Sequence, residues 1–186
     1  MLIESVGPQA QVGELCRIIT KANQEGIPAE VIGLDDKIVK LMSYENVEGI
    51  RLGDEVVASG ELLKIDVGDA LLGRVIDGLG RARDFRENPY SPIKYPLEAV
   101  APDPMSRKPI NRRIVTGIRA IDSLLAVGCG QRLGIFSGSG VGKSTLLGMI
   151  ARNTNADVNV IALIGERGRE VMDFIERDLG EEALKK

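Results

Sequence analysis

The first 68 residues alternate between short apolar runs and turn residues. The runs are rich in Val, Ile and Leu and have the length of strands; they cover residues 12–18, 27–34, 37–42 and 54–60. Gly, Pro and Asp separate them, as is typical of tight turns. Short strands at this spacing predict a small barrel or sandwich over residues 1–68. The chain opens directly in strand-like residues, which suggests that a first strand is missing.

The pattern changes over residues 69–113. Residues 67–84 contain an apolar stretch flanked by glycines, which predicts one further strand. Residues 87–113 contain six prolines, and this density forbids a regular helix or a central strand. We therefore expect a strand followed by an extended Pro-rich connector that leads into a second domain.

Residues 114–186 alternate between two periodicities. Apolar residues at helical spacing predict helices over residues 116–127, 143–152 and 168–180. The run at 131–136 reads as a strand, and the continuous apolar run at 157–165 is typical of a strand buried on both faces of a parallel sheet. Strand, helix, strand and helix in this order predict a right-handed βαβ unit and part of a parallel sheet.

A glycine-rich loop lies between the predicted strand at 131–136 and the helix that follows. It matches the phosphate-binding pattern at its second glycine, its lysine and its hydroxyl, although Ser137 stands where that pattern has glycine. The candidate nucleotide-binding residues are Ser137, Gly138, Ser139, Gly140, Val141, Gly142, Lys143, Ser144 and Thr145. Lys143 would reach the β- and γ-phosphates, and Ser144 would offer its hydroxyl to Mg²⁺. The alternative is a flexible glycine turn between two elements.

The predicted strand at 157–165 ends next to Glu166. Ligands in open α/β sheets bind beyond the carboxyl ends of the strands, so Glu166 and the glycine loop are expected at one edge. The chain has no histidine, so a general base must be a carboxylate. Glu166 could orient or deprotonate a water that attacks the γ-phosphate, or it could be a surface residue paired with Arg167 or Arg169.

The net charge of the chain is −3, which argues against a strongly basic nucleic-acid-binding surface. No apolar run approaches the length of a membrane span, and no signal peptide is visible. Two cysteines are too few for a disulfide framework. Composition therefore favours a globular protein without a nucleic-acid partner.

The motifs GIFSGSGVGKSTLLGMIAR and VIALIGERGREVMDFIE closely resemble the ATPases of flagellar and type III protein export, which are related to the catalytic subunits of rotary ATP synthases. The resemblance extends over nearly the whole chain. It implies an N-terminal β-barrel followed by a RecA-like P-loop ATPase domain, with ATP and Mg²⁺ as cofactors. It assigns Glu166 as the catalytic glutamate, Arg167 as the adjacent arginine of the site, Lys143 as the phosphate lysine and Ser144 as the magnesium ligand.

The resemblance also implies partners and a location. The family forms homo-hexamers that contact export-gate and stalk components in the cytoplasm, peripheral to the membrane. Export substrates and chaperones meet a C-terminal part that this chain does not include, and the family's second acidic strand and arginine finger also lie beyond Lys186. We therefore expect this chain alone to bind ATP weakly and not to turn it over.

Two other functions stay open. The first is a subunit of a rotary F-, V- or A-type ATPase, catalytic or non-catalytic; non-catalytic subunits carry another residue at the position of Glu166. The second is a nucleic-acid motor of the Rho type, which would need aromatic platforms on its β-domain. The first 68 residues contain a single aromatic residue, Tyr44, so this function ranks last.

Overall fold

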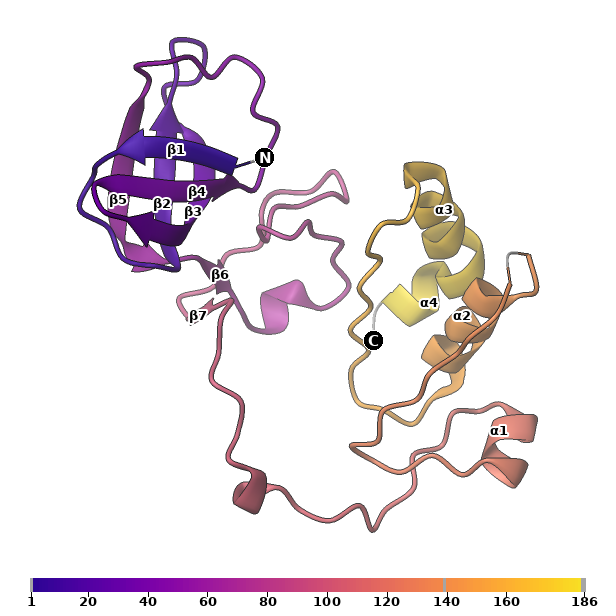
Figure 1. Cartoon of the computed structure of the whole chain (residues 1–186). Helices are drawn as coiled ribbons and strands as arrows, with labels where there is room; N and C mark the ends of the chain where they lie inside the picture. The colour runs from indigo at the N-terminus through magenta and orange to yellow at the C-terminus, as the bar shows by residue number, and fades with distance from the viewer. Residues whose placement is uncertain (1, 139, 185–186) are drawn as a thin grey trace. The chain divides into compact units, whose positions relative to one another are not determined.

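The computed structural model describes residues 2–138 and 140–184. Its contacts divide the chain into two compact units (Figure 1). Unit 1 comprises residues 1–67 and 90–101, and unit 2 comprises residues 68–89 and 102–186. The predicted domain boundaries at residues 68 and 113 stay a prediction, and the units are described below one at a time.

Unit 1 is built on a five-stranded antiparallel sheet with the order β1-β4-β3-β2-β5. Its strands are β1 (Leu2–Val6), β2 (Glu14–Ile19), β3 (Ile27–Asp35), β4 (Ile38–Ser43) and β5 (Glu55–Leu62). The strands curl around a shared core (Figure 1). Among the described residues no ladder joins β1 to β5, so hydrogen bonds do not close this sheet into a barrel.

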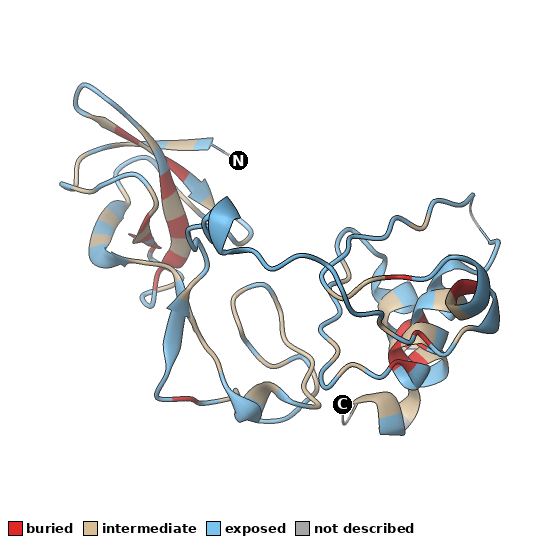
Figure 2. Ribbon diagram, turned by 90° about the horizontal axis from the view of Figure 1, so that it is seen from below, coloured by how far each residue is buried: buried red, intermediate tan, exposed pale blue. Residues whose placement is uncertain are grey.

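The core of unit 1 follows the two-residue period of its strands. In β2, Cys16 and Ile18 are buried while Arg17 between them is exposed. The neighbouring strands do the same, and the buried cluster consists of Cys16, Ile18, Ile27, Ala29, Val31, Val39 and Leu41 (red in Figure 2). Alternating burial is what holds an antiparallel strand in one register, since a slip by one residue would expose every core side chain.

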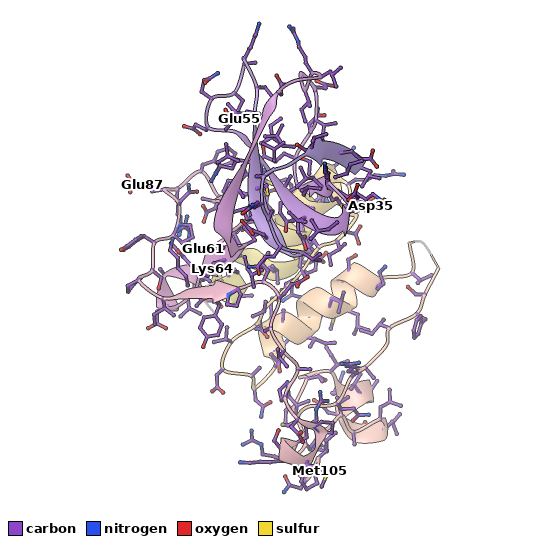
Figure 3. All side chains as sticks on the ribbon, turned by 60° about the vertical axis from the view of Figure 1, so that its left-hand side comes forward. Asp35, Glu55, Glu61, Lys64, Glu87 and Met105 are labelled. Atoms are coloured by element: carbon purple, nitrogen blue, oxygen red, sulfur yellow. The ribbon has the colours of Figure 1, made fainter. Side chains whose placement is uncertain are left out.

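The chain returns to unit 1 after an excursion into unit 2. β6 (Lys64–Asp66) pairs antiparallel with β7 (Lys94–Pro96), and Lys64 forms a 3.0 Å ion pair with Glu61 (Figure 3). Pro96 is tolerated because it lies in an edge strand. From residue 101 to 113 every residue is exposed, and the only regular element there is the short 3₁₀ turn η2 (Pro104–Ser106). The predicted Pro-rich connector between two domains stays a prediction, and residues 94–96 within it form β7.

The predicted strand within residues 67–84 is wrong. The 3₁₀ turn η1 (Asp69–Leu71) leads instead into an irregular hairpin with one isolated bridge, Ile76 to Ala82. Side chains fix it: Arg74 donates from Nε (2.6 Å) and Nη2 (3.0 Å) to the two carboxylate oxygens of Asp84. These bonds hold the pKa of Asp84 well below its usual range. Fixed ion pairs take the place of a strand ladder.

Unit 2 contains the helices α1 (Arg119–Leu124), α2 (Lys143–Asn153), α3 (Gly168–Asp173) and α4 (Gly180–Leu184). A π-helical segment, η3 (Phe174–Leu179), continues α3. The predicted helices are confirmed, with a shorter first helix and a π-helical turn in the last one. Ala151, Phe174 and Leu179 form a small buried cluster where α2, η3 and α4 pack together.

The two predicted parallel strands of unit 2 are not formed. Among the described residues, 131–138 and 157–165 carry no strand pairing. Most of their apolar side chains are exposed: Phe136 is 96%, Val160 93% and Ile164 89% exposed. Both segments have the composition of buried strands, but neither finds a neighbouring strand whose N–H and C=O groups could complete a ladder. The predicted partial parallel sheet is therefore corrected to two unpaired segments.

Candidate nucleotide-binding site

The glycine loop ends where α2 begins. Gly140 and Gly142 have positive φ angles of 77° and 97°, a left-handed conformation that favours glycine. Gly142 is the N-cap of α2, so no side chain caps the first N–H groups of the helix. Lys143 and Ser144 are the first two residues of α2, and both are exposed. The loop therefore presents bare backbone donors and the positive end of a helix dipole to solvent.

The glycines of the loop are not explained by packing. A Cβ built at Gly138, Gly140 or Gly142 would meet no atom within 4 Å. At Gly140 and Gly142 the backbone angle accounts for glycine, but Gly138 has no positive φ. Because an added Cβ would meet no atom, there is open space beside the backbone of Gly138. Such space suits the close approach of a phosphate, so the residues present fit a nucleotide.

The structure leaves one candidate residue outside its description. Ser139 lies outside the described residues, while Ser137, Val141 and Thr145 are exposed parts of the loop and of the first turn of α2. An exposed hydroxyl at Ser144 fits a Mg²⁺ ion that keeps most of its waters. No group of three or more Asp, Glu or Cys residues gathers into a metal site within residues 2–138 and 140–184.

The C-terminal end of α2 is firmly held. Asn159 donates from Nδ2 to the carbonyl oxygen of Ala151 (2.9 Å), and the amide of Asn155 donates to the carbonyl of Val115 (3.1 Å). Gly117 lies so close that a Cβ there would be 2.9 Å from the carbonyl oxygen of Asn153. The glycine loop is thus the free end of a helix whose other end is fixed.

Asp122 supports this anchorage, and the sequence analysis missed it. Its carboxylate accepts hydrogen bonds from the Thr116 amide (2.9 Å), the Thr116 hydroxyl (2.8 Å) and the Gly117 amide (2.9 Å). These bonds, led by the Thr116 amide, lower the pKa of Asp122. The carboxylate thereby fixes the turn that packs against the end of α2. The available signal was an Asp that follows a Thr-Gly pair by a few residues; it lies in the first turn of the observed α1.

Glu166 and Arg167 lie in the turn that leads into α3. Glu166 is exposed and follows Gly165, which has a positive φ of 73°. Arg167 is the N-cap of α3, and its carbonyl accepts the amide of Val171 (3.1 Å). In the described part of the chain Glu166 forms no ion pair with Arg167 or Arg169, and no interaction joins it to Lys143 or Ser144.

Two family models match this chain. Both are described as the ATP synthase alpha/beta family: its beta-barrel domain matches residues 1–60, and its nucleotide-binding domain matches residues 117–186. Together the two matches span more than half of the chain, which therefore belongs to the ATP synthase alpha/beta family. The predicted fold class, a β-barrel domain followed by a nucleotide-binding domain, is confirmed.

Within this family the chain is similar to flagellum-specific ATP synthases and type 3 secretion system ATPases. It is 60% identical over 186 residues to the flagellum-specific ATP synthase of Treponema pallidum (strain Nichols), covering all of this chain and 42% of that protein. It is 44% identical over 183 residues to the type 3 secretion system ATPase of Xanthomonas euvesicatoria, covering 98% of this chain and 41% of that protein. The predicted resemblance is confirmed.

The fold also matches a solved assembly. The assembled ATPase EscN in complex with its central stalk EscO, from the type III secretion system of enteropathogenic E. coli, superposes with a TM-score of 0.86 at 46% identity. The match covers all of this chain and 45% of that chain, so this chain spans about two fifths of the length of its relatives. Of the helices in the described residues, none has the length and hydropathy needed to cross a bilayer.

Proposed function

We propose that residues 137–145 bind the phosphates of ATP and that the protein hydrolyses ATP to drive flagellar or type III protein export. The observation that carries this proposal is the open backbone of Gly138, Gly140 and Gly142 in front of the uncapped N-terminus of α2. Bare amides at a helix N-terminus bind anions, and Lys143 adds a full positive charge beside them.

In this proposal the side chains divide the work of phosphoryl transfer. Lys143 binds the β- and γ-phosphates, Ser144 offers its hydroxyl to Mg²⁺, and Thr145 contributes to the same binding site. Glu166 orients a water and accepts its proton as the water oxygen attacks the γ-phosphorus. The bond between that phosphorus and the β,γ-bridging oxygen breaks, and ADP leaves with the electron pair. Mg²⁺, when bound, neutralises charge on the phosphate oxygens. Arg167 contributes a second cation to the site.

The proposed partners follow from the relatives. EscN assembles and binds a central stalk, and we extend both properties to this protein as a homo-hexamer with a stalk component. Export-gate components, export substrates and chaperones belong to the same proposal, as does a cytoplasmic position at the inner face of the membrane export apparatus. A pull-down with the product of the complete open reading frame that recovers no stalk or gate component would count against these partners.

Nucleotide binding is tested on this chain itself. We expect a fluorescent ATP analogue to bind weakly in the presence of Mg²⁺, without turnover. Lys143→Ala should lower the affinity by about ten- to hundredfold, because a charge-assisted contact to phosphate is lost. Equal binding by both proteins would contradict the phosphate site.

Hydrolysis is tested on the product of the complete open reading frame. Glu166→Gln should reduce the rate of phosphate release by about 10²- to 10⁴-fold while nucleotide binding remains, because the amide cannot accept the proton of the attacking water. A variant that hydrolyses ATP like the wild type would contradict the role of Glu166, and a wild type that binds ATP without hydrolysing it would favour the alternative of a non-catalytic rotary subunit.

A further inference from the structure

The helix that carries the glycine loop touches η3 at backbone distance. Gly148, in the middle of α2, is buried, and a Cβ built there would lie 2.6 Å from the carbonyl oxygen of Asp178. The same Cβ would lie 2.7 Å from the Asp178 Cβ and 2.9 Å from its carbonyl carbon. These atoms cannot rotate away as the end of a long side chain could, so only glycine fits without moving one helix.

The conformation of Gly148 does not itself require glycine. Its φ is not positive, and glycine in a helix interior costs about 1 kcal/mol relative to alanine. The close approach to Asp178 is therefore the structural reason for glycine at this position. Glycine at this position lowers the helix propensity of α2 but allows the backbone of η3 to come close. It therefore sets the distance between α2 and η3.

The two elements that meet at Gly148 carry different parts of the proposed site. α2 begins with Lys143 and Ser144, whereas η3 continues α3, which starts two residues after Glu166. Phe174 and Leu179 of η3 pack with Ala151 of α2, so the contact belongs to a buried interface. The contact at Gly148 therefore fixes the position of the phosphate loop, at the start of α2, relative to the Glu166 carboxylate, just before α3.

The far side of α2 limits how it can move. At its C-terminal end, Gly117 packs against the backbone of Asn153, where an added Cβ would be only 2.9 Å from the carbonyl oxygen. A side chain at position 148 would consequently tilt α2 away from η3, with the fixed end as the pivot. The largest displacement would then occur at the free end, which carries the loop.

We propose that Gly148 is a positioning residue that sets the distance between the phosphate loop and Glu166. The inference rests on the proposed ATPase function. The loop amides, Lys143 and Ser144 belong to the loop and α2, so these phosphate ligands move together and continue to bind the nucleotide. Glu166 belongs to the other element and loses its alignment with the attacking water. A misplacement of about 1 Å is enough to slow a reaction by about a hundredfold.

The test uses Gly148→Ala in the product of the complete open reading frame. The kcat for phosphate release should fall by about ten- to hundredfold, while the Kd for Mg-ADP, measured by calorimetry, stays within about twofold. Gly78→Ala is the matched control, because its φ is not positive and its new Cβ would meet no atom within 4 Å. It should keep the wild-type kcat, Kd and melting temperature.

Three outcomes would overturn the inference. An unchanged kcat in Gly148→Ala would show that the contact does not align the site. Loss of Mg-ADP binding and a lowered melting temperature, together with the loss of kcat, would show that the contact only stabilises the fold. Equal rates of phosphate release in the wild type and Lys143→Ala would overturn the ATPase proposal, and this inference with it. The first two leave the ATPase proposal intact, so the failures are distinguishable.

Discussion

Unit 1 and unit 2 differ in how far they pair their backbone N–H and C=O groups and bury their apolar side chains. In unit 1 every strand of the five-stranded sheet has a neighbour, and seven side chains form one buried cluster. In unit 2 the buried cluster has three residues, and two segments with strand-like composition stay unpaired among the described residues. Antiparallel strands that follow one another can pair through short turns, whereas parallel strands need partners from distant parts of a chain. The same apolar composition is therefore buried in one unit and exposed in the other.

The largest effect is expected in the small cluster of unit 2. Phe174 is 5% exposed, and Phe174→Ala should cost about 3–5 kcal/mol of unfolding free energy, because few other side chains can fill the cavity. Hydrogen exchange should then show faster exchange of the α2 amides, with β1–β5 still protected. An equal loss of protection in both units would show that their cores do not unfold separately.

The core of unit 1 gives the matching experiment. Leu41 is fully buried, and Leu41→Ala should cost about 2–5 kcal/mol. This loss is measured by urea unfolding, with hydrogen exchange of the β-strand amides as the readout. Binding of the fluorescent ATP analogue by unit 2 should stay unchanged, and a parallel loss of binding would argue that the units stabilise one another.

The hairpin of residues 72–89 offers a smaller, pH-dependent effect. The pKa of Asp84 is lower in the folded protein than in the unfolded chain, because Arg74 hydrogen-bonds its carboxylate. Its stabilisation is therefore present above the ordinary carboxyl pKa of about 4 and is lost as the pH falls through the lowered folded-state value. Asp84→Asn should lower the urea midpoint at pH 7 and flatten its fall between neutral and acid pH.

Asp35→Asn is the control for this titration. Asp35 also forms an ion pair, with Lys40 at 3.1 Å, but its side chain is 67% exposed. Exposed pairs contribute little to stability, so this variant should follow the wild-type midpoint at every pH. Identical behaviour of the two Asn variants would mean that the ion pair of Arg74 and Asp84 does not hold the hairpin.

The smallest effect is expected in the unpaired segments of unit 2. Val160 is 93% exposed, so Val160→Ser should change the unfolding free energy by less than about 0.5 kcal/mol. The measurement is the same urea unfolding that is used for Leu41→Ala. A loss as large as that of the core variant would show that the segment is packed in solution.

The structural features that were predicted correctly from the sequence are those that depend on residues close together along the chain. The apolar runs within residues 12–60 were enough for β2 to β5 of unit 1, and the glycine loop with its lysine was enough to place the start of α2 at Lys143. The hairpin at 72–89 was missed because Arg74 and Asp84, ten residues apart, replace a ladder with an ion pair. The contact of Gly148 with Asp178 depends on packing between helices, which no local pattern encodes.

The path of the backbone has a practical consequence for anyone who wishes to isolate one unit. The chain leaves unit 1 at residue 67, re-enters it at residue 90 and leaves it again after residue 101. A single proteolytic cut after residue 101 would therefore keep both stretches of unit 1 on one fragment, but that fragment would also carry residues 68–89 away from the rest of unit 2. A stand-alone version of unit 1 would have to excise residues 68–89 and rejoin the ends with a short linker, so that β7 still reaches β6.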